Sequence, residues 1–91
     1  MLILPIKRKW YNMILSGEKK EEYREIKPYY TSRFKNYINK NVDIILRNGY
    51  SLSSPQIKCK CFLTIGEGKE EWGANPKKQY YILKILNVKE I

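Results

Sequence analysis

The sequence predicts an α+β domain, in which a small, strongly curved and mostly antiparallel sheet is covered at one end by a helix. Several short segments alternate apolar and polar residues with a period of two, which is typical of half-buried strands. One early segment instead has the spacing of a helix, and a second, shorter segment has a helical pattern as well. The chain has 91 residues, of which 43% are hydrophobic, so we expect a single domain over residues 1–91 with a small core.

The N-terminal residues predict a strand followed by a helix. Residues 2–4 form a short apolar run. Pro5 suits the first turn of a helix, where the N–H that proline lacks has no partner anyway. Gly17 stands where this helix ends, because the residue after the last turn often adopts a left-handed conformation. Between these two positions the apolar residues fall at helical spacing: Ile6, Trp10, Met13 and Ile14.

Residues 20–27 and 29–39 predict a strand and a helical segment. In the first, Glu22 and Arg24 fall on one face and Tyr23 on the other, because successive side chains of a strand point to opposite faces. Pro28 ends this strand. The second segment is aromatic and basic, with apolar residues at helical spacing, and it forms either one helix or a helical turn over the core.

The remaining residues predict three strands. Residues 42–47 form the first, and Asn48-Gly49 after it is typical of a tight turn. Residues 57–65 alternate most clearly, and residues 79–88 form the closing strand. We expect the apolar face of the middle strand to belong to the core: Ile57, Cys59, Cys61, Leu63 and Ile65.

A segment without periodic pattern, residues 66–78, joins the last two strands. Connections of this length in a compact domain are often functional. Trp72 within it is either an anchor or lid at a binding site, or a plug for one end of a barrel. The sequence leaves these alternatives equal.

The composition favours polyanionic partners. The chain has 18 lysines and arginines against nine aspartates and glutamates, which gives a formal net charge of +9. A field of this sign attracts nucleic acid first and anionic membranes second. No apolar run approaches the roughly 20 residues of a membrane span. We therefore expect a cytoplasmic protein with no membrane association; the sequence does not indicate its oligomeric state.

The chain has no histidine and two cysteines. Without histidine, the usual general base is missing, and Ser-His or Cys-His catalysis is excluded. Cys59 and Cys61 lie two apart on one strand face, where they cannot easily close a disulfide, and two thiolates alone do not complete a zinc site. We expect both to be buried as small hydrophobes, and we expect no metal and no cofactor.

Residues 17–24 concentrate both signs of charge in a chain that is otherwise poor in acids. Gly17, Lys19, Glu22 and Arg24 spell G-x-K-x-x-E-x-R, between the predicted helix and the following strand. Lysine and carboxylate can serve as acid and base, and arginine can hold a phosphate or carbonyl oxygen. The alternative is that Glu22 and Arg24 form an ion pair that only fixes the exit of the helix against the sheet.

This motif, with the later E-W-G-A-N-P loop and the closing Tyr-Tyr-Ile-Leu-Lys-Ile strand, resembles the ASCH domain of the PUA-like superfamily. The resemblance covers essentially the whole chain. It implies a small PUA-like β-barrel with one N-terminal helix, a second short helical segment and a cleft beside the motif. It also implies an association with RNA or with modified nucleosides and nucleotides. Some relatives are amidohydrolases that act on acylated cytidine, and others have been described as ribonucleases.

The resemblance also implies roles for residues. Lys19 and Glu22 are the catalytic candidates, although Glu22 stands where the amidohydrolase branch has threonine, which argues against a covalent mechanism. A second carboxylate would come from Glu67, Glu70 or Glu71. The substrate-binding candidates are Gly17, Tyr23, Arg24, Glu71 and Trp72.

Candidate nucleic-acid contacts combine rings with cations, since single strands are held by phosphates on cations and bases on aromatic side chains. They are Lys7, Arg8, Tyr30, Arg33 and Lys35. The alternative is that the rings belong to the core and the cations only to solvent. The leading hypothesis is a module that binds RNA or a modified nucleotide in a cleft lined by lysine, glutamate and arginine. The second is a small, metal-independent hydrolase that uses Lys19 and a glutamate.

Overall fold

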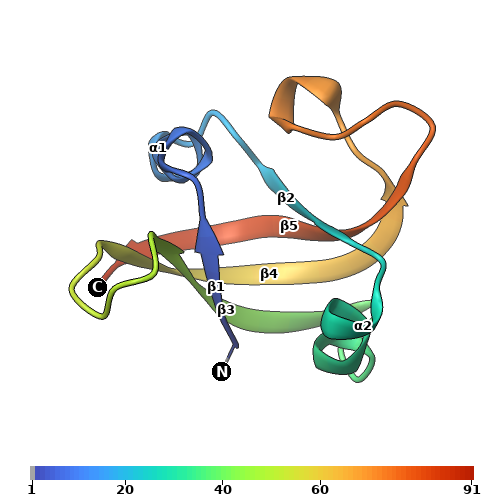
Figure 1. The fold of residues 1–91 in the computed structure, drawn as a ribbon, viewed down its shortest axis with the longest axis horizontal. Helices are drawn as coiled ribbons and strands as arrows, with labels where there is room; N and C mark the ends of the chain where they lie inside the picture. The colour runs from blue at the N-terminus through green and yellow to red at the C-terminus, as the bar shows by residue number, and fades with distance from the viewer. Residues whose placement is uncertain (1) are drawn as a thin grey trace.

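The computed structural model describes residues 2–91, which form the expected α+β class with two α-helices and a five-stranded sheet (Figure 1). The elements are β1 (Leu2–Ile6), α1 (Arg8–Ser16), β2 (Glu21–Glu25), α2 (Pro28–Phe34), β3 (Lys40–Asn48), β4 (Gln56–Glu67), the 3-10 helix η1 (Glu70–Trp72) and β5 (Gln79–Glu90). The strand order is β1-β3-β4-β5-β2. β1 pairs parallel with β3, and the other neighbours pair antiparallel, so the sheet is mixed.

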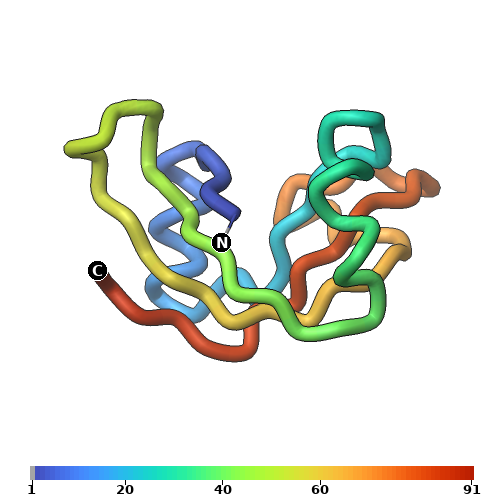
Figure 2. Tube along the Cα trace, turned by 90° about the horizontal axis from the view of Figure 1, so that it is seen from below, coloured from blue at the N-terminus to red at the C-terminus, as the bar shows by residue number. Residues whose placement is uncertain are grey.

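The sheet is curled into a half-barrel, which Figure 2 shows as an open trough. β4 and β5 have 12 residues each and run through its middle, where the natural twist of long strands accumulates. A β-bulge interrupts their pairing: Cys61 lies opposite Ile85 and Lys60 opposite Asn87, so Leu86 is the extra residue. Such a bulge bends the strand and increases its twist. α1 and α2 lie over the open side of the trough, one at each end (Figures 1 and 2).

The main core lies on the concave face of the half-barrel. β3 and β4 contribute alternate residues to it, as a sheet with one buried face requires. Tyr11 and Ile14 of α1 and Phe34 of α2 close the open side over them. The fully buried strand residues are Leu4, Ile44, Leu46, Ile57, Cys59, Cys61, Leu63 and Leu83. Burial of each large aliphatic side chain stabilises the fold by about 1.5–3 kcal/mol.

A second, smaller cluster lies on the convex face. It contains Ala74, Tyr80 and Ile82, with Tyr23 packed against them. The loop between β4 and β5, which includes η1, covers this cluster. β5 is therefore buried on both faces over residues 80–83, whereas its later residues have an exposed convex side.

The predicted helix start at Pro5 is wrong. Pro5 lies in β1 opposite Arg47, and α1 begins at Arg8. β1 is an edge strand, and proline is tolerated there because the side of the strand that faces no neighbour has no carbonyl that needs the missing N–H. Gly17, with a φ of 87°, ends α1 as predicted.

Three further expectations differ from the structure: a turn, the burial of one residue and the length of a helical segment. The predicted tight turn at Asn48-Gly49 is wrong, because β4 begins only at Gln56 and residues 49–55 form a longer loop. Ile65 shares the face of Leu63 but is 45% exposed, because β4 extends beyond the core at that end. Of the segment 29–39, only the part up to Phe34 is helical, in α2.

No helix in the described part of the chain is long and apolar enough to cross a membrane.

Both cysteine thiols are fully buried and free, as the sequence predicted. Burial raises the pKa of Cys59 from its usual 9.0 to about 11, and it raises the pKa of Cys61 as well. The unfolded state therefore loses its thiol protons first, so these groups lower the free energy of unfolding as the pH rises above about 9.

We predict that neither thiol reacts with a disulfide reagent in the native protein at pH 8, because the thiolate is the reactive form and both groups are inaccessible. Two equivalents of thiol should react in denaturant, as measured by absorbance of the released aryl thiolate. Rapid reaction of either cysteine under native conditions would contradict this packing.

Candidate functional site

The charge cluster of residues 17–24 folds into a chain of ion pairs, Lys19–Glu22–Arg24. Gly17 reverses the chain after α1 in a left-handed conformation that glycine reaches without strain. β2 then places Glu22 and Arg24 on the same face, because residues two apart in a strand share a face. The pair lies at the edge of the main core, with both side chains at most 10% exposed.

Lys19 is buried below Glu22. Its Nζ lies 3.2 Å from Oε1 of Glu22 and donates hydrogen bonds to the carbonyls of Glu21 and, at 3.1 Å, Trp72. The same nitrogen lies 5.2 Å from the ring centroid of Trp10 and 4.8 Å from that of Tyr23. Burial lowers the pKa of Lys19 and outweighs the opposite effect of Glu22, while the positive charge of Arg24 adds to the lowering.

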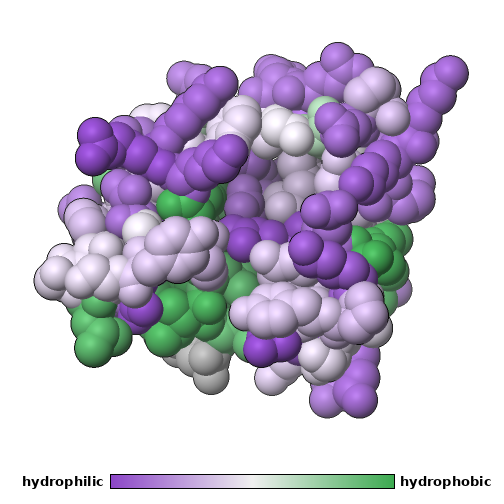
Figure 3. Space-filling model, viewed as in Figure 1, coloured by the Kyte–Doolittle hydropathy of each residue, from purple (hydrophilic) through white to green (hydrophobic). Residues whose placement is uncertain are grey.

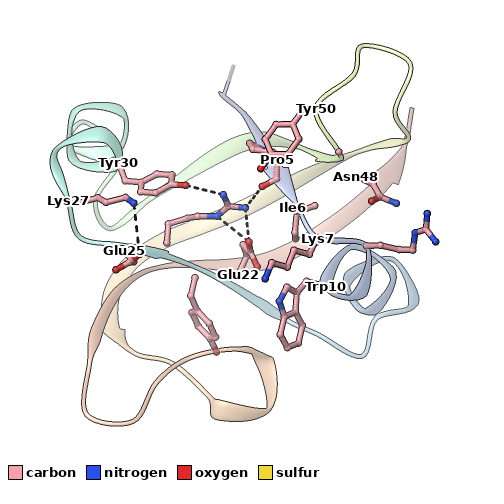
Figure 4. A pocket seen from close by; sticks show the side chains of 14 residues that line it. Pro5, Ile6, Lys7, Trp10, Glu22, Glu25, Lys27, Tyr30, Asn48 and Tyr50 are labelled. Carbon is pink, nitrogen blue, oxygen red and sulfur yellow. Dashed lines mark hydrogen bonds and ion pairs between the residues drawn. The ribbon is translucent and has the colours of Figure 1, made fainter.

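Arg24 joins three elements through its guanidinium group. Its Nε and Nη2 donate to Oε2 of Glu22 at 3.1 and 2.7 Å, and Nη2 also donates to the carbonyl of Pro5 at 2.8 Å. Nη1 donates to the hydroxyl of Tyr30 at 3.2 Å. These bonds tie β2 to β1 and α2 (Figure 4). Burial by itself would lower the pKa of Arg24, but the interactions with Glu22 and Tyr30 outweigh this effect, so the pKa is raised.

A cleft of about 530 Å³ opens above this pair, between α1 and α2. Figure 3 shows the face that carries it, on which hydrophilic side chains lie above and to the right of the centre and hydrophobic ones below and to the left. Trp10, Tyr30 and Tyr50 contribute aromatic rings to its lining. The lining residues are Pro5, Ile6, Lys7, Arg8, Trp10, Glu22, Tyr23, Arg24, Glu25, Lys27, Tyr30, Asn48, Gly49 and Tyr50 (Figure 4).

The fold brings together six of the site residues predicted from sequence: Lys7, Arg8, Glu22, Tyr23, Arg24 and Tyr30. Lys19 contacts Glu22 but does not line this cleft. It lines, with Gly17, a smaller groove of about 240 Å³ between the end of α1 and β5. Arg33 and Lys35 are exposed on and after α2, outside the lining residues.

The loop between β4 and β5 contributes backbone rather than a carboxylate. Trp72 is 9% exposed, and its carbonyl accepts a hydrogen bond from Lys19. The backbone N–H of Lys69 donates to the hydroxyl of Tyr23 at 2.9 Å. The candidates for a second carboxylate, Glu67, Glu70 and Glu71, are all exposed and none lines the cleft. This loop therefore holds Lys19 and Tyr23 through main-chain hydrogen bonds and contributes no carboxylate to the cleft.

Sequence reasoning missed about half of the cleft. Ile6 lies opposite Asn48 in the parallel pairing of β1 with β3, which brings the ends of both strands to one place. That pairing joins segments about 40 residues apart and has no local sequence signal. Lys27 and Trp10 carried a signal, since they are a cation and a ring next to predicted site residues. The missed residues are Pro5, Ile6, Trp10, Glu25, Lys27, Asn48, Gly49 and Tyr50.

The residues available to the site are nitrogen cations, carboxylates and rings. Within residues 2–91, no three histidine, cysteine, aspartate or glutamate side chains gather into a group that could hold a metal ion. No family model, no curated protein and no solved structure matches this chain. The chemistry of the cleft is therefore inferred from its own residues.

We predict that Glu22→Ala lowers the free energy of unfolding by about 3–5 kcal/mol, because it leaves the buried charges of Lys19 and Arg24 without their partner. Glu25→Ala on the same strand is the matched control, since Glu25 forms only exposed ion pairs with Lys27 and Lys78 and should change stability little. Urea unfolding followed by fluorescence measures both. Equal losses of unfolding free energy in the two variants would show that the buried ion pairs contribute no more to stability than the exposed ones.

Proposed function

We propose that this chain is a binding module of the ASCH type, with a PUA-like half-barrel, that takes RNA or a modified nucleotide into the cleft between α1 and α2. One observation supports the proposal above the others: exposed cations and aromatic rings converge on a cleft of about 530 Å³ whose floor is the Glu22–Arg24 pair. Pockets for ligands of nucleotide size have about 300–1,000 Å³.

The lining suits the two chemically different parts of a nucleotide. Lys7, Arg8 and Lys27 are exposed cations at the mouth of the cleft and can contact a phosphate. Trp10 and Tyr30 are half-buried rings on which a base can stack, a contact worth about 1–3 kcal/mol per base. Lys27 already lies 3.9 Å from a carboxylate oxygen of Glu25, whereas a small apolar ligand would give Lys7 and Arg8 no anionic partner.

Arg24 also supports a polar ligand. A guanidinium has five N–H donors, and four hydrogen bonds join Arg24 to Glu22, Pro5 and Tyr30. One N–H of Nη1 therefore has no acceptor among the described residues. Because the remaining donors fix the group, this N–H is pre-oriented for a carbonyl or phosphate oxygen.

The alternative, a hydrolase that uses Lys19 and a glutamate, has one observation in its favour: the pKa of Lys19 is lowered, which eases the loss of a proton. Two observations favour binding instead. Lys19 is outside the cleft lining, and both oxygens of Glu22 already face a cation. A general base must lie within hydrogen-bond reach of the proton that it removes.

We predict that Lys7→Gln/Lys27→Gln weakens binding of cytidine monophosphate about ten-fold or more, because a hydrogen bond to a charged group contributes about 1.5–3 kcal/mol. Arg33→Gln/Lys35→Gln removes the same charge outside the cleft and should change affinity much less. Quenching of tryptophan fluorescence measures both, since Trp10 lines the cleft. Absence of nucleotide binding by the folded wild-type protein would reject the proposal.

We also predict weak or no release of the acyl group from acylated cytidine by the wild-type protein, because Glu22 replaces the hydroxyl residue of the amidohydrolase branch. Chromatography of the products measures it, with Glu22→Gln and Lys19→Ala as comparison variants. Efficient turnover that a folded Lys19→Ala variant loses would make the hydrolase the better assignment.

A further inference from the structure

The convex face of the sheet carries a second group of cations, on the side opposite the cleft. Lys58 and Lys60 alternate outward along β4, since Cys59 and Cys61 between them are in the main core. Lys84 faces outward on β5 beside the inward Leu83. We call the outward lysines 58, 60, 84 and 89 the convex lysine patch.

The β-bulge brings the last member, Lys89, into this patch. Without the extra residue Leu86, positions 87 and 89 of β5 would continue the inward series of Leu83 and Ile85. The bulge changes the phase, so that Val88 packs against the main core and Lys89 points outward. The strand irregularity therefore determines where this charge lies.

The arrangement places like charges against each other. Lys58 lies directly opposite Lys89 in the β4–β5 register, and its other neighbour, Ile45 of β3, is uncharged. Like charges directly opposite in a sheet are destabilising. Asp43 lies opposite Lys60 and Glu21 opposite Lys84. Nevertheless, across residues 2–91, no member of the patch has a carboxylate oxygen within ion-pair distance.

From this placement we infer that the convex lysine patch binds the phosphate backbone of a nucleic acid, independently of the cleft. Neighbouring strands are about 4.8 Å apart, and residues two apart on a strand about 6.8 Å. Four flexible ammonium groups on such a grid can contact several phosphates of one strand. Phosphates would also relieve the repulsion between Lys58 and Lys89.

The chemistry of the face favours nucleic acid over a protein. Protein interfaces are depleted of lysine and depend on large apolar or aromatic anchors. Beside the lysines lie Ile45 and Phe62, both half-buried, together with Ile3, which pairs with Ile45 and is 47% exposed, and Leu86 at the bulge, which is 57% exposed. These side chains come from four different strands and include no exposed aromatic ring, so the lysines rather than a central apolar anchor dominate the face. Binding through charge has no sequence preference.

The test compares two variants with equal net charge. Lys58→Gln/Lys89→Gln should lower the affinity for a fluorescent 20-nucleotide oligouridine and reduce the slope of log K against log salt by about 1.4, since each phosphate contact on a single strand contributes about 0.7. The control, Lys40→Gln/Lys77→Gln, replaces exposed lysines outside both the patch and the cleft lining and should leave the slope unchanged. Anisotropy at several salt concentrations measures both.

Binding of cytidine monophosphate separates this inference from the proposed function of the cleft. Lys58→Gln/Lys89→Gln should leave it unchanged, and a cleft without nucleotide affinity would not affect the salt slope assigned to the patch. A slope change equal to that of the control would overturn the inference. The inference would also be overturned if the double variant lost binding to vesicles that contain phosphatidylserine but kept its affinity for oligouridine, since the patch would then bind membranes. Lys89→Glu, which pairs with Lys58, should raise the melting temperature while weakening oligouridine binding, so reduced binding cannot be attributed to unfolding.

Discussion

The carboxylate of Glu22, held between two buried cations, is the interaction on which the rest of the structure depends. Lys19 binds one of its oxygens and also the carbonyls of Glu21 and Trp72, so it fixes the loop between β4 and β5. Arg24 binds the other oxygen and also the backbone of β1 and the hydroxyl of Tyr30 in α2. Elements from both ends of the half-barrel therefore converge on one negative charge. Because each cation would be costly to bury alone, the three groups form a single unit.

Much of the fold could be predicted from local patterns. β3 and β4 have apolar residues at every second position through the core, and the first helix ends at a glycine that has to be left-handed. The predictions were wrong where the conformation of a residue depends on contacts with a segment far away in the sequence. Pro5 is compatible with both a helix start and an edge strand, and only the pairing of β1 with β3 selects the strand. Ile65 follows the same alternation as Leu63, but it is exposed because β4 extends beyond the core at that end.

The site could be predicted only in part, for the same reason. The spacing of Glu22 and Arg24 along one strand was enough to place them on one face. It could not show that Lys19 approaches Glu22 from below and lies outside the cleft lining, because this depends on how tightly the chain turns after Gly17. Tyr50 and Asn48 join the cleft through the register between β1 and β3, which only the three-dimensional structure provides.

Pro5 has a consequence for how an unclosed barrel avoids association with other chains. A sheet with free edges presents unpaired N–H and C=O groups, which can nucleate the growth of aggregates. β1 forms one of these edges. At Pro5 the edge has no N–H to donate, and the carbonyl of that residue already accepts a hydrogen bond from Arg24. An incoming strand therefore finds no partner at this position of β1, and the guanidinium that fixes the site also protects the edge against templated aggregation.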